Sequence, residues 1–459
     1  MDEQDLKTTQ KSVLIVATVS SFLTPLSLAT VNVALPRIGR AFSADAITLN
    51  WVATIYLLTA AMFLVPFGKI SDIYGRRKIF IYGMWVFTVS SLCLGLAPSV
   101  GSLLAFRALQ GIGSSMVFGT GVAMLTSVYP PGERGHALGI NIAAVYLGLS
   151  CGPFVGGLLT QHLGWRSVFL FNVPLGFFVI FLSIKKLKQE WAEARGESLD
   201  IAGSLIYALT LLLLMYGFSR LPSVTGLLFV LSGMAAIGAF IWWELRTKTP
   251  ILEISLFVTN KVFTLSNVAA LINYSATFAV GFLLSLYLQY IKGLTPQSAG
   301  LVLVSQPIVQ AAFSPLAGKL SDRIEPRLVA SAGMALTTVG LILLALLTAA
   351  TPLPYIIASL AVLGFGFALF SSPNSNAIMS SVENRFYGIA SSTLATTRLI
   401  GQMLSMGIAM VVFALFIGKV AITPPYYGLL VKSTKIIFTI FAILCVGGTF
   451  ASLTRGNLR

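Results

Sequence analysis

The stretch Gly68-Lys69-Ile70-Ser71-Asp72 recurs as Gly318-Lys319-Leu320-Ser321-Asp322, at an offset of 250 positions (318 minus 68). Glu133 recurs as Glu383 at the same offset. Both stretches are short polar segments between long apolar runs. Because self-similarity at a fixed offset indicates a duplicated structural unit, the sequence predicts two homologous halves.

The composition around this repeat is that of a membrane protein. Of the 459 residues, 56% are hydrophobic and only 10% are charged, whereas soluble domains carry about 25% charged residues. These values exclude an ordinary water-soluble enzyme. They also exclude disorder, which requires low hydrophobicity and high net charge. We therefore expect an all-α polytopic membrane protein whose environment is the lipid bilayer.

The uncharged runs predict fourteen transmembrane helices, since a hydrocarbon core about 30 Å thick requires about 20 apolar residues per helix. The first run is expected to be retained, because it is too long for the core of a signal peptide. The predicted spans are 13–36, 47–67, 79–97, 103–128, 137–160, 166–184, 201–219, 222–243, 262–291, 296–317, 328–348, 353–377, 386–417 and 436–454.

Six spans with short loops need about 190 to 200 residues, so the repeat offset leaves room for two further helices. We expect a six-helix half at 1–190, a linker with a two-helix insertion at 191–257, and a second six-helix half at 258–459. Parallel six-helix repeats of this kind are a known transporter architecture. A chance match of five residues is the alternative explanation of the repeat.

The formal net charge is +15, from 30 Lys and Arg against 15 Asp and Glu. Lys and Arg are enriched in cytoplasmic loops, and the basic clusters fit this rule when both termini are cytoplasmic. We therefore interpret the charge as a sign of topology and expect no nucleic-acid partner. The predicted location is the cell membrane, with multiple passes.

No His, Cys and carboxylate cluster with metal-ligand spacing occurs in the sequence. Cys93, Cys151 and Cys445 all fall in apolar spans, and His136 and His162 are far apart. The chain also has no Gly-x-x-x-x-Gly-Lys-Ser/Thr loop for ATP. We expect no metal, no cofactor and no enzymatic activity.

The loop after the second span combines charge with flexibility. Gly68 would let two helix ends approach closely, and Gly75 would permit a tight turn. Asp72 can pair with Arg76 or with a helix amino terminus. Such a group can fasten the cytoplasmic ends of helices in one conformation, and the second half offers Gly318 and Asp322 for the same role. A purely topogenic basic loop is the alternative.

Two arginines lie inside apolar spans, where a charge normally faces a polar cavity or a partner. Arg107 precedes Gln110 in the fourth span, and Arg398 lies about twelve residues into its span by the 20-residue criterion. The alternative is an arginine that extends to the membrane interface. We expect Arg107 and Arg398 to face a central cavity.

The fifth span carries Gly148, Gly152 and Gly156 at intervals of four residues, with Pro153 and Gly157 beside them. Small residues at this spacing form a smooth stripe against which another helix can pack closely. Proline removes a backbone donor and can bend the helix. The pattern fits both a moving helix and static packing.

These motifs resemble those of the major facilitator superfamily, in particular its fourteen-spanning drug:proton antiporter branch. The family's loop motif is matched by Gly68, Asp72, Gly75 and Arg76, and its fourth-span arginine by Arg107. Its antiporter motif, a mark of exporters, is matched by Gly148, Gly152, Pro153, Gly156 and Gly157. The segment from Thr30 to Pro36 looks like the end of its first-span motif.

The resemblance implies alternating access, with multidrug or metabolite efflux and a proton as the coupling ion. The sequence departs from the family at Ser27, where an Asp is usual, and at Glu325 and Pro326 in the second loop.

None of the fifteen acidic residues falls deep in a predicted span. Since an intramembrane carboxylate is the usual partner of a cationic substrate, we expect a small amphipathic substrate that is neutral or anionic. Asp72 and Glu133 are possible proton carriers, although a structural ion pair is the simpler role. The polar side chains expected in the cavity are Ser27, Asn32, Gln110, Asn141, Tyr146, Asn273, Gln306, Gln310 and Asn374.

The leading hypothesis is thus an exporter, a monomeric secondary antiporter. An uptake carrier or facilitator for an organic anion is the alternative within transport. An integral-membrane enzyme and a channel are the alternatives from other classes.

Overall fold

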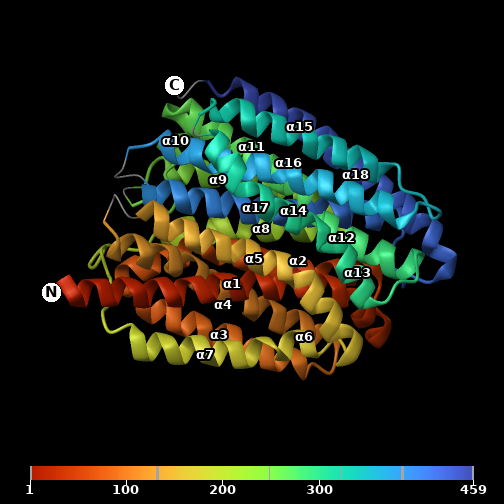
Figure 1. Cartoon of the computed structure of the whole chain (residues 1–459), viewed down its shortest axis with the longest axis horizontal. Coiled ribbons are helices and arrows are strands. Elements are labelled where there is room, and N and C mark those ends of the chain that lie inside the picture. The colour runs from red at the N-terminus through yellow and green to blue at the C-terminus, as the bar shows by residue number, and fades with distance from the viewer. Residues whose placement is uncertain (1–2, 131–133, 248, 322, 384–386, 457–459) are drawn as a thin grey trace.

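The computed structural model describes residues 3–130, 134–247, 249–321, 323–383 and 387–456. Fourteen helical segments in these ranges are long and apolar enough to cross a membrane, which confirms the predicted number. Both termini lie at the same end of the bundle, at the left of Figure 1. By the orientation that the loop charges predict, this end is cytoplasmic and the opposite end, at the right, is external.

The helices follow one another in the predicted order of half, insertion and half. The first half contains α1 (Glu3–Phe42), α2 (Ala46–Tyr74), α3 (Arg76–Gly95), α4 (Val100–Val128), α5 (Arg134–His162), α6 (Ser167–Leu170) and α7 (Asn172–Lys186). The insertion contains α8 (Ile201–Arg220) and α9 (Val224–Glu244). After α10 (Ile254–Thr259) come α11 (Lys261–Thr277), α12 (Ala279–Leu286), η1 (Tyr287–Ile291), α13 (Pro296–Leu303), α14 (Ser305–Ser321), α15 (Pro326–Ala345), α16 (Leu353–Ser380), α17 (Tyr387–Phe416), η3 (Pro424–Tyr426) and α18 (Tyr427–Thr454).

Local sequence signals set several helix boundaries. Asp45 and Asp200 cap α2 and α8, each through a carboxylate that accepts a backbone N–H three residues later. Ser99 and Ser102 form a reciprocal capping box at the start of α4. Such caps satisfy backbone donors that the first helical turn leaves unpaired.

The packing of the helices repeats between the halves. In the first half α1 packs on α5, α2 on α4, and α3 on α4 and α7. In the second half α11 packs on α17, α14 on α16, and α15 on α16 and α18. The equivalent positions of these pairs support the duplication inferred from the repeated stretch.

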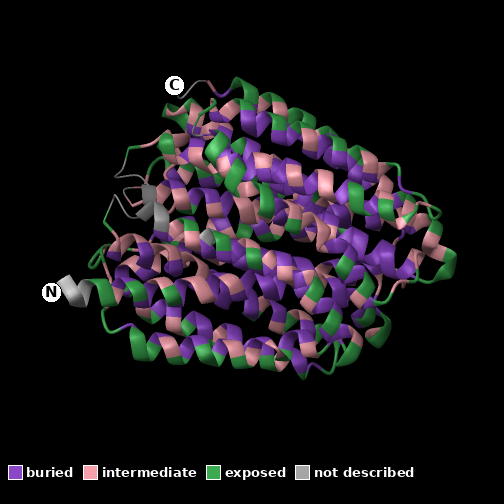
Figure 2. Cartoon of the chain, viewed as in Figure 1, coloured by how far each residue is buried: buried purple, intermediate pink, exposed green. Residues whose placement is uncertain are grey.

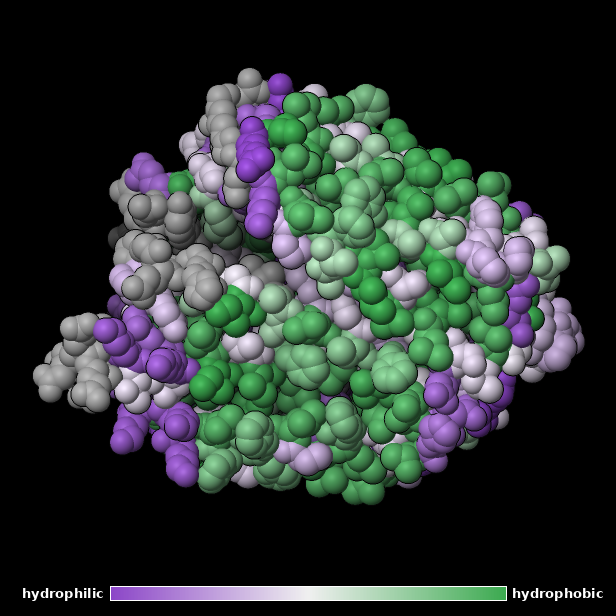
Figure 3. Space-filling model, in the orientation of Figure 1, coloured by the Kyte–Doolittle hydropathy of each residue, from purple (hydrophilic) through white to green (hydrophobic). Residues whose placement is uncertain are grey.

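The inserted helices do more than cover one half. Helix α8 contacts α2 of the first half and α17 of the second half, and its Tyr207 donates a hydrogen bond to the carbonyl of Ala61. Helix α9 is mostly exposed, with four buried residues among its 21. Figure 2 shows exposed residues gathered on the outer helices and buried residues towards the middle of the bundle. Figure 3 shows a broad hydrophobic belt between hydrophilic ends, as expected for a protein that spans a bilayer.

Candidate functional site

A cavity of about 200 Å³ lies between the two halves. Aromatic and amide side chains form much of its wall, with contributions from helices of both halves. Among the described residues that line it, Arg398 is the charged one. The polar and aromatic lining includes Asn32, Tyr56, Phe118, Tyr146, Tyr274, Phe278, Gln306, Gln310, Phe367 and Gln402.

The halves are joined tightly on the external side of this cavity. Gln289 donates a hydrogen bond of 2.9 Å to the carbonyl of Val33, and Ser285 donates one of 2.7 Å to the carbonyl of Asn32. Nearer the external surface, the backbone N–H of Ala46 bonds to the carbonyl of Val420. Backbone contacts between α5 and α13 complete this closure.

A second space of about 620 Å³ lies on the cytoplasmic side, and we call it the vestibule. It shares Phe118 and Ala395 with the central cavity, so the two spaces adjoin. Lys69 and Asp72 line one wall of the vestibule, and the segment of α17 around Ser391 lines another. A site closed outside and open towards the cytoplasm is an inward-facing arrangement.

Arg398 is held in the cavity by aromatic rings. Its guanidinium lies 5.1 Å from the centre of the Tyr274 ring, within the range of a cation–π contact. Its Nε has no hydrogen-bond partner among the described residues. Nearby, the Tyr146 hydroxyl makes a short hydrogen bond with Ser371 across the two halves. Arg398 therefore offers an unsatisfied donor to a bound molecule.

Arg107 does not line the cavity, which corrects the expectation from the sequence. Its side chain is fully buried behind Tyr56, 4.5 Å from the ring centre. Nε donates to the carbonyl of Val52 at 3.0 Å, and Nη1 donates to Gln110 at 2.7 Å. Tyr56 itself lines the cavity, so its ring connects the Arg107 guanidinium to the cavity wall.

The other expected polar residues divide into two groups. Asn32, Tyr146, Gln306 and Gln310 line the cavity as expected. Ser27 and Gln110 belong instead to the buried network around Arg107, where Ser27 accepts hydrogen bonds from both Gln110 and Asn172.

Three further candidates also lie outside the cavity lining. Asn141 bonds to Ser21, and Asn273 is buried within α11. Asn374 accepts a hydrogen bond of 2.6 Å from Arg455. Burial lowers the pKa of the Arg455 guanidinium. These five candidates (Ser27, Gln110, Asn141, Asn273 and Asn374) were wrongly expected in the cavity because the polarity of a side chain does not reveal which face of its helix it occupies.

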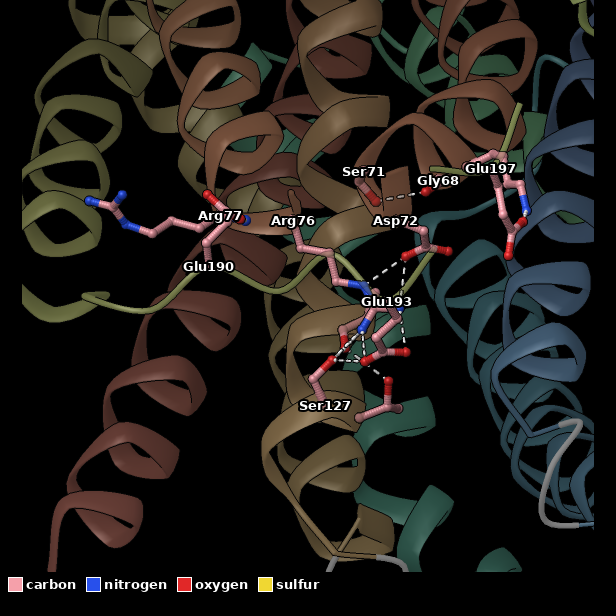
Figure 4. Close-up of polar contacts among 12 residues, drawn as sticks. Gly68, Ser71, Asp72, Arg76, Arg77, Ser127, Glu190, Glu193 and Glu197 are labelled. Atoms are coloured by element: carbon pink, nitrogen blue, oxygen red, sulfur yellow. Dashed lines mark hydrogen bonds and ion pairs between the residues drawn. The ribbon is translucent and has the colours of Figure 1, made fainter. Parts of the chain in front are cut away.

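The loop between α2 and α3 forms a compact ion-pair network (Figure 4). Arg76 Nε donates to Asp72 at 2.7 Å, and Arg76 Nη1 donates to Glu193 at 2.7 Å and to Ser127 over a shorter distance. Gly75 has a φ of +118°, and a Cβ there would lie 2.5 Å from the Glu190 carboxyl group. The backbone conformation therefore favours glycine at position 75, and a larger residue would also displace the Glu190 side chain.

No close helix contact requires a glycine at position 68, contrary to the expectation, since a Cβ there would meet nothing within 4 Å. In the second half, Gly318 is close to Ser372. Asp322 and Glu133 lie outside the described residues. Pro326 begins α15 at the position equivalent to Arg76, so the second loop lacks the arginine that organises the first.

The linker after α7 completes the network, and sequence reasoning did not assign it this role. Besides Glu193, Glu190 accepts the backbone N–H of Arg77, and Glu197 pairs with Lys69 at 2.5 Å. The signal was present in the sequence, as three acids at intervals of three or four residues opposite a basic loop. We call this segment, residues 187–200, the strap.

The glycines of α5 allow contacts with two neighbours. Cβ atoms at Gly148, Gly152 and Gly156 would collide with α1 at distances of 2.2–2.6 Å, so this stripe packs within the first half. Gly157 faces the other way, and a Cβ there would lie 2.6 Å from the carbonyl of Pro296 in α13. Pro153 also faces α13, where its carbonyl oxygen approaches Gly300.

Two six-helix halves around a central cavity are an architecture of membrane transporters. Residues 17–242 and 267–456 match the model of the Major Facilitator Superfamily, and the chain belongs to this family.

Named relatives share most of the chain. The riboflavin transporter RibZ of Clostridioides difficile (strain 630) is 32% identical over 84% of this chain and 84% of its own length. The multidrug resistance protein Stp of Mycobacterium tuberculosis (strain CDC 1551 / Oshkosh) is 31% identical over 87% and 75%, respectively. A bacterial homolog of the human lysosomal transporter Spinster, solved in an inward-facing and unoccupied conformation, has the same fold, with a TM-score of 0.68, 16% identity and 97% of each chain covered.

Proposed function

We propose that this chain is a proton-coupled exporter of small amphipathic organic compounds, neutral or anionic, in the cell membrane, and that it acts as a monomer. The observation that carries the substrate class is the placement of Arg398 in a cavity whose described lining contains no carboxylate. A cationic substrate would be repelled there, whereas an anion would gain a charge-assisted hydrogen bond.

The aromatic lining favours flat substrates. Tyr274 and Phe367 make an edge-to-face pair at 5.6 Å, and Tyr56, Phe118 and Phe278 also line the cavity. Rings of this kind bind planar apolar bodies, while convergent amide groups fix the polar edge. Multidrug resistance proteins among the relatives support export of such compounds.

A riboflavin-like neutral heterocycle is a second candidate substrate. The relative RibZ is named for riboflavin, and the amides of Gln306, Gln310, Gln402 and Asn32 surround the same cavity as the aromatic rings. This architecture can carry such a compound into or out of the cell. The direction of transport is therefore measured separately from the substrate class.

Alternating access supplies the mechanism. The inward-facing cavity takes substrate from the cytoplasm through the vestibule, and the external contacts between α5 and α13 must separate for release. The network of Asp72, Arg76 and Glu193 holds the cytoplasmic ends of α2, α3 and α4 together as one body. The halves can then rotate as units because their internal contacts stay intact.

The test is transport by purified protein in lipid vesicles that contain a pH-sensitive dye. Fluorescein, riboflavin and ethidium serve as anionic, neutral and cationic probes. We expect Arg398→Ala to lower fluorescein transport at least about tenfold, since a hydrogen bond to a charged group contributes about 1.5–3 kcal/mol. Arg220→Ala is the matched control, because Arg220 stacks on Tyr216 at the same 5.1 Å but on an inserted helix outside the cavity.

Strong ethidium transport that Arg398→Ala leaves undiminished would contradict the substrate class. Counterflow with and without a proton gradient separates antiport from facilitated uptake. A flux that does not saturate would indicate a channel instead of a carrier.

A further inference from the structure

The inserted helices carry a pair of buried carboxylates at their cytoplasmic ends. Asp200 is 9% exposed and Glu244 is 4% exposed. Among the described residues, these are the two acidic side chains that are buried. They lie outside the central cavity and outside the network around Arg76.

The two carboxyl groups face one another across Gly203. A Cβ at Gly203 would lie 2.4 Å from Oδ2 of Asp200 and 2.6 Å from Oε1 of Glu244. By the triangle inequality these two oxygens are at most 5.0 Å apart. Two negative charges at this separation in a buried site repel strongly, so one carboxyl group is expected to be neutral.

The hydrogen bonds distinguish the two carboxyl groups. Asp200 accepts the N–H of Gly203 at 2.9 Å and the indole N–H of Trp243 at 2.9 Å. It also lies at the amino terminus of α8, where the helix dipole favours a negative charge. Asp200 is thus built to carry the charge.

Glu244 has the opposite surroundings. It is the last residue of α9, where the helix dipole disfavours a negative charge. Its Oε2 accepts the backbone N–H of Leu252 at 2.9 Å, but its Oε1 has no partner among the described residues. An O–H at this oxygen would place a donor within 5.0 Å of Oδ2 of Asp200.

Among the described residues, no basic side chain is found to act on Glu244 and balance its charge in place of a proton. The acidic side chains that act on Glu244 electrostatically are Asp200 and Glu253. The charged side chains on neighbouring elements have partners elsewhere: Lys69 with Glu197, Asp72 with Arg76, Arg398 with Tyr274, and Arg246 with Trp242.

We propose that Asp200 and Glu244 form a proton-binding site in which protonated Glu244 donates a hydrogen bond to ionised Asp200. The site joins the segments that enter and leave the insertion. Asp200 ends the strap before α8, and Glu244 accepts a hydrogen bond from Leu252, in the segment after α9 that lines the vestibule. Proton release leaves two like charges close together, which pushes these two segments apart. Its effect on transport rests on the proposed proton-coupled antiport, whereas the site itself does not.

The direct test is infrared spectroscopy of the purified full-length protein in lipid nanodiscs at about pH 7, close to the cytoplasmic value. Wild type should show the C=O stretch of a protonated carboxylic acid. An ordinary Glu has a pKa of about 4.3 and would give no such band, because it is already ionised at pH 7. The band should be lost in Glu244→Gln, which keeps the shape and the donor of the neutral form. It should also be lost in Asp200→Asn, because Glu244 then loses the carboxylate that faces it across Gly203.

Two control variants should retain the band. Asp45→Asn changes another aspartate that caps a helix, at the external end. Glu253→Gln removes a partly exposed acid that bonds to Ser255 in the same connection.

The proposal would be overturned if the band were absent from wild type or unchanged in Glu244→Gln. Loss of the band on addition of sodium at constant pH would also overturn it, because the site would then bind a metal cation. If the band behaves as expected but no substrate moves protons, the antiport proposal fails and the proton site stands.

Discussion

Replacing Gly300 by alanine should shift the protein from the inward-facing towards the outward-facing state. A Cβ at Gly300 would lie 2.2 Å from the carbonyl oxygen of Pro153. Ordinary contacts begin at 3.4 Å, so α5 and α13 must separate by more than about 1 Å at this point. The clash exists only while the external ends are closed, because these helices part when the site opens outwards.

The magnitude follows from the cost of overpacking. Inserting a methyl group into a close contact costs about 1–3 kcal/mol. Applied to one of two conformational states, this cost changes their ratio by about 5- to 150-fold. The inward-facing population should fall accordingly.

The assay is electron–electron distance measurement between spin labels at Gly101 and Ala350, which are exposed at the external ends of the two halves. The background lacks Cys93, Cys151 and Cys445. We expect a longer-distance population in Gly300→Ala that is minor in the parent protein.

Two controls isolate the cause of this shift. Gly447→Ala adds a methyl group where nothing lies within 4 Å, so the distances should not change. Gly152→Ala creates a similar clash of 2.2 Å with Ala29 inside the first half, so it should lower thermal stability without changing the ratio of states. Identical distance distributions for Gly300→Ala and Gly447→Ala would refute the reasoning.

Three further predictions concern stability and are measured by thermal unfolding in detergent. Gly75→Ala should destabilise by about 1–3 kcal/mol, since only glycine adopts this backbone conformation without strain; an unchanged Tm would contradict the steric argument. Arg107→Met should cost about 1–3 kcal/mol, because Gln110 and the Val52 carbonyl lose a buried partner; a more stable variant would show that the isolated charge is the larger penalty. Lys69→Ala should change stability by less than about 1 kcal/mol, because its ion pair with Glu197 is partly exposed to solvent; a larger loss would mean that the strap depends on this pair.

The spans were predictable because each is decided locally. An uncharged run of about 20 residues must cross the bilayer as a helix, since its backbone groups have no other partners there. The last span begins at Pro424, earlier than the predicted 436, and includes Lys432 and Lys435. These lysines lie near the external end, where the long side chains of such residues reach water.

The position of each polar side chain was not predictable in the same way. Arg107 and Arg398 both interrupt apolar spans, yet one is sealed behind Tyr56 and the other lines the cavity. The difference depends on the rotation of each helix against its neighbours. A single span carries no information about that rotation.

The sequence by itself determined the number of helices, their orientation and the duplication, because hydrophobicity, loop charge and repeated residues act along the chain. Only the tertiary structure decided that the strap binds Arg76 and that Asp200 meets Glu244. Contacts between residues 44 or 117 positions apart arise from how helices pack, and packing depends on the shapes of all the surfaces together.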